Sequence, residues 1–411
     1  MSEARDLKIE VNQLGKWPKL ALMAAVIGMI GTVIGYFLMG EDHGLFFRAY
    51  LVGFMFWFNM AAGCLFWLMV QHLSGGAWGV MIRRVVEAGA RMLPWTLILF
   101  LPIAIFGMHS IYEWTHEDVV KHDLVLSQKA PYLNPTGFYI RLVVYAIIWA
   151  FLAYRLSALS ARQDRGINPK LTLAMKSTSG FGIVLLFLTM TFAAIDWLLS
   201  LEPHFFSTMY GPVIMAGQAL GSMSFIVAIM VLLINAGPMK GRLTSGHVHD
   251  MGNFMLASTM FWAYVNFSQF LIIWGANVAE EVPYFLRRMS GGWGVVGIGL
   301  IAFHFFAPFF LLLNRSLKKN IYVLVKLAWF ILFLRFIDLC YLILPSAFDP
   351  HAPDANYQGH FYLGSILVAA VAVIGVGGIW LFFFFRQLVQ RPLLPVNDPY
   401  MKEALEFRGG H

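Results

Sequence analysis

The feature that most constrains this chain is a series of long apolar segments, each separated from the next by a short polar connection. A helix needs about 20 consecutive apolar residues to cross the hydrocarbon core of a bilayer. Segments of this kind lie at 19–39, 45–73, 92–112, 137–158, 176–199, 211–235, 251–274, 291–313, 321–345 and 361–385. The sequence therefore predicts an all-α, polytopic membrane protein of about ten transmembrane helices.

The composition excludes a soluble enzyme, because only 12% of the 411 residues are charged and 59% are hydrophobic, against about 25% charged residues in soluble domains. The two cysteines, Cys64 and Cys340, both fall inside apolar segments. They provide no disulfide framework, no c-type haem attachment and no thiolate set for an iron–sulfur cluster. We therefore expect no covalently bound cofactor, and any redox centre must belong to a partner subunit.

The net charge of +7 is explained by membrane topology and does not indicate nucleic acid. If the helices alternate in direction, 22 of the 29 Lys and Arg residues fall on one side, which the positive-inside rule makes cytoplasmic. Both termini then lie in the cytoplasm: residues 1–18 precede a membrane domain at 19–385, and a tail at 386–411 follows it. Five basic residues are left for the external side: Arg48, Lys121, Lys129, Arg287 and Arg288.

Three polar segments lie outside the predicted transmembrane helices. Apolar residues recur at helical spacing within 75–91, which predicts an amphipathic helix on the cytoplasmic surface, with a plain loop as the alternative. The external loop 113–136 and the tail 386–411 are interpreted as docking segments for partners, although solvated disorder suits the tail equally well.

Ionisable residues inside a membrane are costly and are candidates for function. His109, Arg141 and Asp196 each lie about one helical turn from the external end of successive helices, so one external pocket could collect all three as a quinone-associated or proton-entry site. The alternative is that each side chain reaches interfacial water on its own.

A second group of polar residues lies deeper in the predicted membrane region. Arg335 and Asp338 share one face of the ninth helix as an ion pair, and His304 precedes Pro308, which removes one backbone hydrogen bond and predicts a kink. A hydrated proton path is predicted from six residues: Ser258, Asn266, Gln269, His304, Arg335 and Asp338. The alternatives are an ion pair that only fixes packing and polar side chains that only join helices.

Neither haem nor a metal is expected in this chain. His72, His109 and His304 lie at different depths, whereas haem ligation needs paired histidines at one depth. The sequence His247-Val248-His249-Asp250 is better explained by Asp250 acting as the N-cap of the seventh helix.

Several long motifs resemble one family. They are His72-Leu73-Ser74-Gly75-Gly76-Ala77-Trp78-Gly79, Arg83-Arg84 with Glu87-Ala88-Gly89-Ala90-Arg91, Asp196-Trp197-Leu198-Leu199-Ser200-Leu201-Glu202-Pro203-His204 with Ser207-Thr208-Met209-Tyr210-Gly211, and Phe261-Trp262-Ala263-Tyr264 with Phe267-Ser268-Gln269-Phe270. They resemble the polysulfide-reductase/NrfD-type integral membrane subunits of alternative complex III, a bacterial quinol:cytochrome c (or quinol:electron acceptor) oxidoreductase. The chain is most similar to the shorter of the two homologous subunits, the second quinone-binding-type subunit.

The resemblance implies an architecture and a set of partners. Helices 2–5 (about 45–199) and helices 6–9 (about 211–345) would form two four-helix bundles, flanked by helices 1 and 10. The partners implied are the homologous membrane subunit, an iron–sulfur protein, a multihaem cytochrome c and small membrane subunits, in the lipid of a bacterial inner membrane. Haem and iron–sulfur clusters would reside only in those partners, and the substrate would be menaquinol or ubiquinol.

The resemblance also implies a site on the external side of the first bundle, where His109 and Asp196 match the family's pattern. Arg141 stands where an acidic residue is expected in the quinol-oxidising member. This departure leaves a quinone-associated pocket, a proton path or both as the function, and the chain is not expected to be catalytic alone. A structural scaffold of the same complex and a stand-alone secondary transporter are the alternatives; a transporter would show paired helix breaks at the midplane.

Overall fold

The computed structural model describes residues 14–40, 42–346, 361–395 and 397–407, which form helices joined by turns. Among the described residues, nine helical stretches are long and apolar enough to cross a membrane. They are α2 (Trp17–Leu38), α3 (His43–Ser74), the run α4 (Arg83–Arg91), α5 (Leu93–Ile98), η3 (Ile103–Gly107) and α6 (Met108–Ile111), then α9 (Pro135–Gln163), α10 (Pro169–Trp197), α11 (Tyr210–Asn235), α12 (Ser245–Ala276), the run α14 (Trp293–Gly299), η6 (Leu300–Phe306) and α15 (Ala307–Leu313), and finally α18 (Leu363–Leu388). The prediction of an all-helical, polytopic membrane protein is confirmed.

The remaining expected crossing, 321–345, forms α17 (Ile321–Ile343). This helix is long and apolar as well, but it carries three charged residues, Lys326, Arg335 and Asp338, which set it apart from the nine stretches above. One face of it packs against α11 and α3. Arg335 and Asp338 lie on this side and are buried against protein, whereas Lys326 is exposed.

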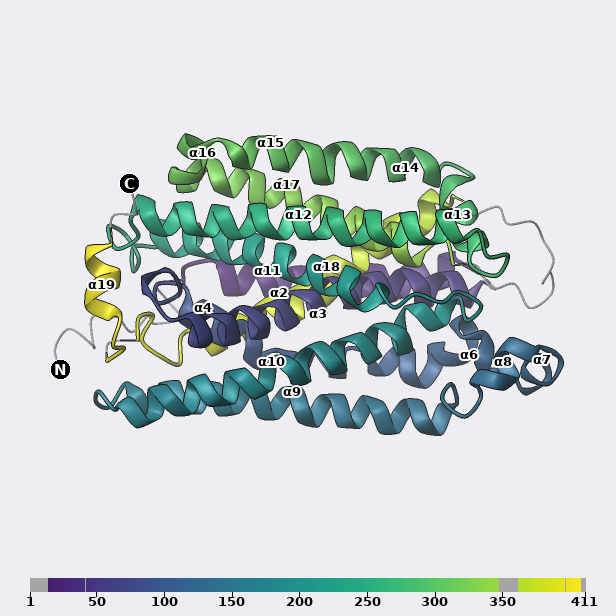
Figure 1. Ribbon diagram of the computed structural model, residues 1–411, viewed down its shortest axis with the longest axis horizontal. Helices are drawn as coiled ribbons and strands as arrows, with labels where there is room; N and C mark the ends of the chain where they lie inside the picture. Colours follow the sequence, from purple (N-terminus) through teal and green to yellow (C-terminus); the bar gives the residue numbers. More distant parts are fainter. Residues whose placement is uncertain (1–13, 41, 347–360, 396, 408–411) are drawn as a thin grey trace.

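The long helices run side by side along the longest axis, and short helices close both ends (Figure 1). We call the two ends the α8 end and the α19 end. The short helices of the α8 end are η4 (Glu113–Thr115), α7 (Glu117–His122), α8 (Leu124–Lys129), η5 (Leu199–Leu201) and α13 (Val282–Met289). Those of the α19 end are η2 (Ala77–Gly79), α16 (Arg315–Lys319) and α19 (Met401–Glu406).

Helix α3 occupies the centre of the packing. On one side it contacts α4, α5 and α10, and α9 packs against these. On another side it contacts α11, which packs with α12 and α17, and the run η6–α15 completes this second group. The paired helices α2 and α18 pack along α3 as well. A helix that is apolar on all sides is expected to be buried in this way.

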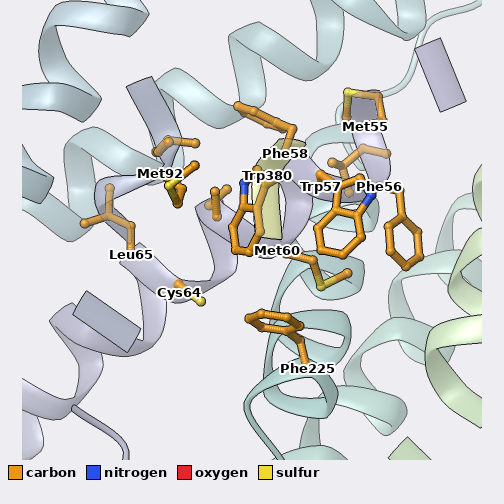
Figure 2. Packing of buried hydrophobic residues seen from close by; sticks show 14 of the residues in the cluster. Met55, Phe56, Trp57, Phe58, Met60, Cys64, Leu65, Met92, Phe225 and Trp380 are labelled. Carbon is orange, nitrogen blue, oxygen red and sulfur yellow. The ribbon is translucent and has the colours of Figure 1, made fainter. Parts of the chain in front are cut away.

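Aromatic rings fill the space around α3 (Figure 2). The rings of Trp57 on α3 and Trp380 on α18 lie 5.2 Å apart, and Phe225 on α11 lies 5.5 Å from Trp380. The polar edge of each indole is satisfied: Trp380 Nε1 donates to Thr96 Oγ1 at 3.0 Å and Trp57 Nε1 to the Val373 carbonyl at 2.8 Å. Buried Trp residues need such partners, and these bonds fix α18 against α3 and α5.

Helices α2 and α18 approach so closely that glycine is required at the contact. A Cβ atom at Gly28 would stand 2.2 Å from the Gly375 nitrogen, and one at Gly378 would stand 2.1 Å from the Ala25 nitrogen. Small residues permit this kind of backbone approach between membrane helices. The first and last long helices are thereby joined directly.

Two of the crossing stretches contain a π-helical turn beside a proline. The turn η3 follows Pro102, and η6 (Leu300–Phe306) ends just before Pro308 and contains His304. A proline lacks the N–H that would bond the carbonyl four residues earlier, and π-bulges are one way in which a helix accommodates such a break. The irregularity expected at His304 is therefore present.

Two predictions for the polar segments are wrong. The segment 75–91 does not lie on a surface as an amphipathic helix: every residue of α4 is buried, and its charged side chains contact protein. The seventh helix does not begin at Asp250. It begins at Ser245, after the N-cap Thr244, because Thr244 and His247 form a capping box.

Candidate functional site

The first site begins with Asp196, whose carboxylate is buried near the end of α10. Arg141 on α9 donates from Nε to both carboxylate oxygens, at 3.1 and 2.9 Å, and Tyr145 donates from its hydroxyl to Oδ2 at 2.8 Å. Arg141 and Tyr145 are four residues apart, so they share one face of α9. The predicted proximity of Arg141 and Asp196 is present.

Tyr132, in the turn before α9, covers the Arg141 guanidinium. Its ring centroid lies 3.9 Å from Arg141 Cζ, and its carbonyl accepts from Arg141 Nη1 at 2.8 Å. The Tyr132 hydroxyl is buried and has no hydrogen-bond partner. Burial, followed by the negative charge of Asp196, raises the pKa of Tyr132 above its usual value, so this phenol remains protonated as a donor.

His109 does not join this cluster. Its side chain is exposed on α6, its carbonyl accepts from His116 Nε2 at 2.8 Å, and the two imidazole centroids lie 5.6 Å apart. The short helix α6 follows the π-helical turn η3. Sequence position alone gave the depth of His109 but not the direction in which its side chain points.

A cavity of about 620 Å³ lies beside the Asp196 cluster at the α8 end. Tyr132 connects the two, because it lines the cavity and also covers Arg141. Ser200 lines the cavity as well, and its Oγ donates to the backbone carbonyl of Asp196 at 2.5 Å. The other lining residues are Gln128, Lys129, Leu133, Ile195, Leu199, Pro203, Phe205, Phe206, Ser207, Thr208, Met209, Gln269, Ile272, Ile273 and Glu281. A mostly apolar wall with a few polar groups is typical of a small-molecule site of this size.

Two of these polar groups can donate to a ligand. Gln269 Oε1 accepts from Ser207 Oγ at 2.9 Å, which leaves the Gln269 amide nitrogen as a donor. Lys129 donates from Nζ to the Pro203 carbonyl and lies 3.6 Å from the centroid of the Phe206 ring. Partial burial lowers the pKa of Lys129 to about 8. Gln269, predicted as part of the proton path, thus belongs to this cavity.

The second site is the buried ion pair of Arg335 and Asp338 on α17. Arg335 Nη1 bonds Asp338 Oδ2, whereas Arg335 Nη2 has no hydrogen-bond partner. The guanidinium fits against α11 because residue 217 is glycine. The predicted pairing on one helical face is present.

The other predicted proton-path residues are only loosely connected to this pair. The His304 ring lies 4.2 Å from Trp262, centroid to centroid, and neither of its nitrogens has a hydrogen-bond partner. Asn266 Nδ2 donates to the Trp262 carbonyl on its own helix at 2.8 Å, and Ser258 lines a separate cavity of about 200 Å³. The described residues give no continuous hydrogen-bond chain from Arg335 to Gln269.

Sequence reasoning missed a third cluster, at the α8 end. Glu202 is buried and forms ion pairs with Arg287 at 2.9 Å and Arg288 at 2.8 Å. The Phe205 and Tyr284 rings stack beside it at 3.9 Å. It joins the loop after α10 to α13, and the only sequence signal was a lone Glu in a loop opposite two adjacent external arginines.

Within the described ranges, no three His, Cys, Asp or Glu side chains gather in a way that could hold a metal ion. No protein-family model matches the chain, and the search of curated proteins finds no match either.

Proposed function

We propose that this chain is an integral membrane subunit of a quinol-oxidising respiratory complex, and that the 620 Å³ cavity holds the quinone ring. The observation that carries the proposal is the contact between this cavity and the Arg141–Asp196 pair through Tyr132, which lines the cavity and covers the Arg141 guanidinium. The motifs that resemble membrane subunits of alternative complex III support the same function. The α8 end is then external and the α19 end cytoplasmic.

The ring would be held by hydrogen bonds to its two oxygens. The Gln269 amide and the Lys129 ammonium group approach the cavity from α12 and α8, so they are suited to bind opposite ends of a quinone. Apolar residues such as Ile195 and Phe205 cover the ring faces. Such a site binds and orients the ring.

Oxidation of a hydroquinone releases two electrons and two protons. The haem and iron–sulfur centres of partner subunits would take the two electrons. Asp196 would accept one proton through the Tyr132 hydroxyl, which interacts with its carboxylate, and the second proton would pass to external water. A carboxylate that reaches the reacting hydroxyl through one intervening group can act as a general base. The Arg335–Asp338 pair and His304 provide a second, deeper set of groups for proton transfer.

The test uses the complex purified through a tag on this chain. Asp196→Asn removes the proton acceptor while its amide preserves the shape of the side chain, so we expect quinol oxidation to fall by at least about a hundredfold, the range typical of general acid–base catalysis. The control is Glu117→Gln, a carboxylate whose side chain is 87% exposed.

An assembled Asp196→Asn complex with normal turnover would overturn the proposed role of this site. It would leave the scaffold alternative. Purification of the chain without haem and iron–sulfur partners, together with solute uptake into proteoliposomes, would instead favour a transporter.

A further inference from the structure

Helix α11 is buried along most of its length but shows one half-exposed row. Pro212, Met215 and Ala219 follow one another at spacings of three and four residues, so they lie on one face. Met209, just before this row, lines the 620 Å³ cavity, whereas Met215 and Ala219 line the cavity of about 200 Å³. The row therefore lies along one face of α11 between the two cavities, and we call this strip, together with the small cavity, the groove.

The walls of this groove are α10 and α12, both of which pack against α11. On α10, Ile195 lines the large cavity and Phe187 the small one; on α12, Gln269 lines the large cavity and Phe261 the small one. Each pair is eight residues apart, which corresponds to about 12 Å along a helix. The groove thus extends from the α8 end toward the middle of the membrane domain.

The small cavity is apolar apart from two side chains, Gln218 and Ser258. Gln218 Nε2 is already engaged, since it donates to Asn59 Oδ1 at 3.1 Å. Phe187 and Phe261, on opposite walls, are 41% and 46% exposed, so the groove is open to lipid along its length. These properties suit a flexible hydrocarbon chain better than a row of water molecules.

We propose that this groove holds the isoprenoid tail of a quinone whose ring occupies the large cavity, and that the quinone enters sideways from the bilayer between α10 and α12. The inference rests on the proposed function, because the ring site defines one end of the tail. It adds the place of the quinone tail and the route by which the quinone enters. It also assigns Ser258 to the tail site instead of a proton path.

The test compares two ligands on the full chain in nanodiscs: a menaquinone with several isoprene units, and tailless 2,3-dimethyl-1,4-naphthoquinone. Ala219→Phe fills the floor of the small cavity. We expect it to weaken binding of the long-tailed quinone by about tenfold, the loss expected for about two methylene groups kept out of an apolar site, and to leave the tailless quinone unaffected. The matched control, Ala370→Phe, changes a half-buried alanine on α18, which does not line either cavity.

A menaquinone with a photoreactive group on its tail gives a second measurement on the unaltered chain. Crosslinks should map to Met215, Ser258 or Phe261. Equal weakening of both ligands, or of neither, in Ala219→Phe would overturn the tail site, as would crosslinking of the same residues by a phospholipid probe in preference to the quinone probe. Failure of the unaltered chain to bind either quinone would instead contradict the proposed function.

Discussion

Gly217 on α11 lies against the guanidinium group of Arg335 on α17, so closely that a Cβ atom at residue 217 would stand 2.0 Å from Arg335 Nη2 and 2.4 Å from Cζ. A buried arginine cannot move away freely, because Asp338 holds its other nitrogen. The absence of a side chain at residue 217 of α11 therefore leaves room for the guanidinium group of Arg335 on α17.

This relationship predicts that Gly217→Ala is destabilising. Overpacking a tight core typically costs about 1–3 kcal/mol, and here it also displaces a charge from its counter-ion, so we expect a lower midpoint of thermal unfolding in detergent. Gly299→Ala is the matched control, since nothing lies within 4 Å of a Cβ there. Equal stability of the two variants would show that Arg335 moves without cost.

The second prediction separates the two possible roles of the Arg335–Asp338 pair. Asp338→Asn leaves Arg335 buried without a counter-ion, which costs about 3–5 kcal/mol, whereas Asp338→Asn with Arg335→Gln removes both charges and should restore most of the stability. In proteoliposomes of the complex, the double variant should oxidise quinol with reduced proton translocation. Full translocation would show that the pair serves only packing.

The third prediction concerns Lys129, whose pKa is lowered by burial from 10.5 to about 8. Between these two pH values the unfolded chain binds more protons at this residue than the folded chain does. Its contribution to the free energy of unfolding therefore rises with pH across that window. Acylation of Lys129, followed by mass spectrometry, should show a half-maximal rate near pH 8. An inflection near the ordinary lysine value of about 10.4 would contradict the burial of its ammonium group.

The fourth prediction concerns the segment after α18, which covers α4. Asp398 pairs with Arg83, and Arg391 donates to Glu87 at 3.3 Å and to the Ser157 carbonyl at 2.6 Å. Asp398→Asn leaves a buried arginine without its carboxylate, so limited proteolysis should cut the segment 389–407 faster. Glu403→Gln, an exposed carboxylate on α19, should leave cleavage unchanged. Identical digestion of all three proteins would argue against a stabilising ion pair.

The fifth prediction is topological. Lys121 on α7 and Lys240, in the turn between α11 and α12, belong to opposite ends of the helices. Single cysteines placed beside them should therefore react with an impermeant thiol reagent from opposite sides of the membrane, with Lys240 cytoplasmic. Labelling of both positions from one side would contradict the model of alternating helices.

The long helices could be predicted from the sequence because each one satisfies a single strong constraint, the thickness of the bilayer core. Pairs of residues within one helix, such as Arg335 and Asp338, could also be predicted, because helical spacing determines which residues share a face. Arg141 and Asp196 could be expected to meet because both lie shallow on successive helices. Spacing also contained a signal that was overlooked: Tyr145 follows Arg141 by four residues.

Contacts between distant segments could not be predicted in this way. Nothing in residues 75–91 shows that Asp398, 315 positions after Arg83, covers them, so an amphipathic pattern suggested a membrane surface. His109 follows a π-helical turn. Such a turn rotates the side chains that follow it, and the amount of rotation cannot be predicted from the spacing of apolar residues. The cavity walls come from four separate segments, and side-chain packing alone determines whether a space remains between them.

The close pairing of α2 with α18 has a consequence for biogenesis. Among the long helices described, α2 is synthesised before the others, and its glycine-lined face is matched by α18, which is synthesised after them. The charges of α4 are neutralised by residues that follow still later. Until α18 is inserted, lipid or an insertion factor must therefore cover the face of α2 that α18 later contacts. The contact between α2 and α18 can form only after all the intervening helices have been synthesised, so a chain truncated before α18 would expose the glycine-lined face of α2 to membrane quality control.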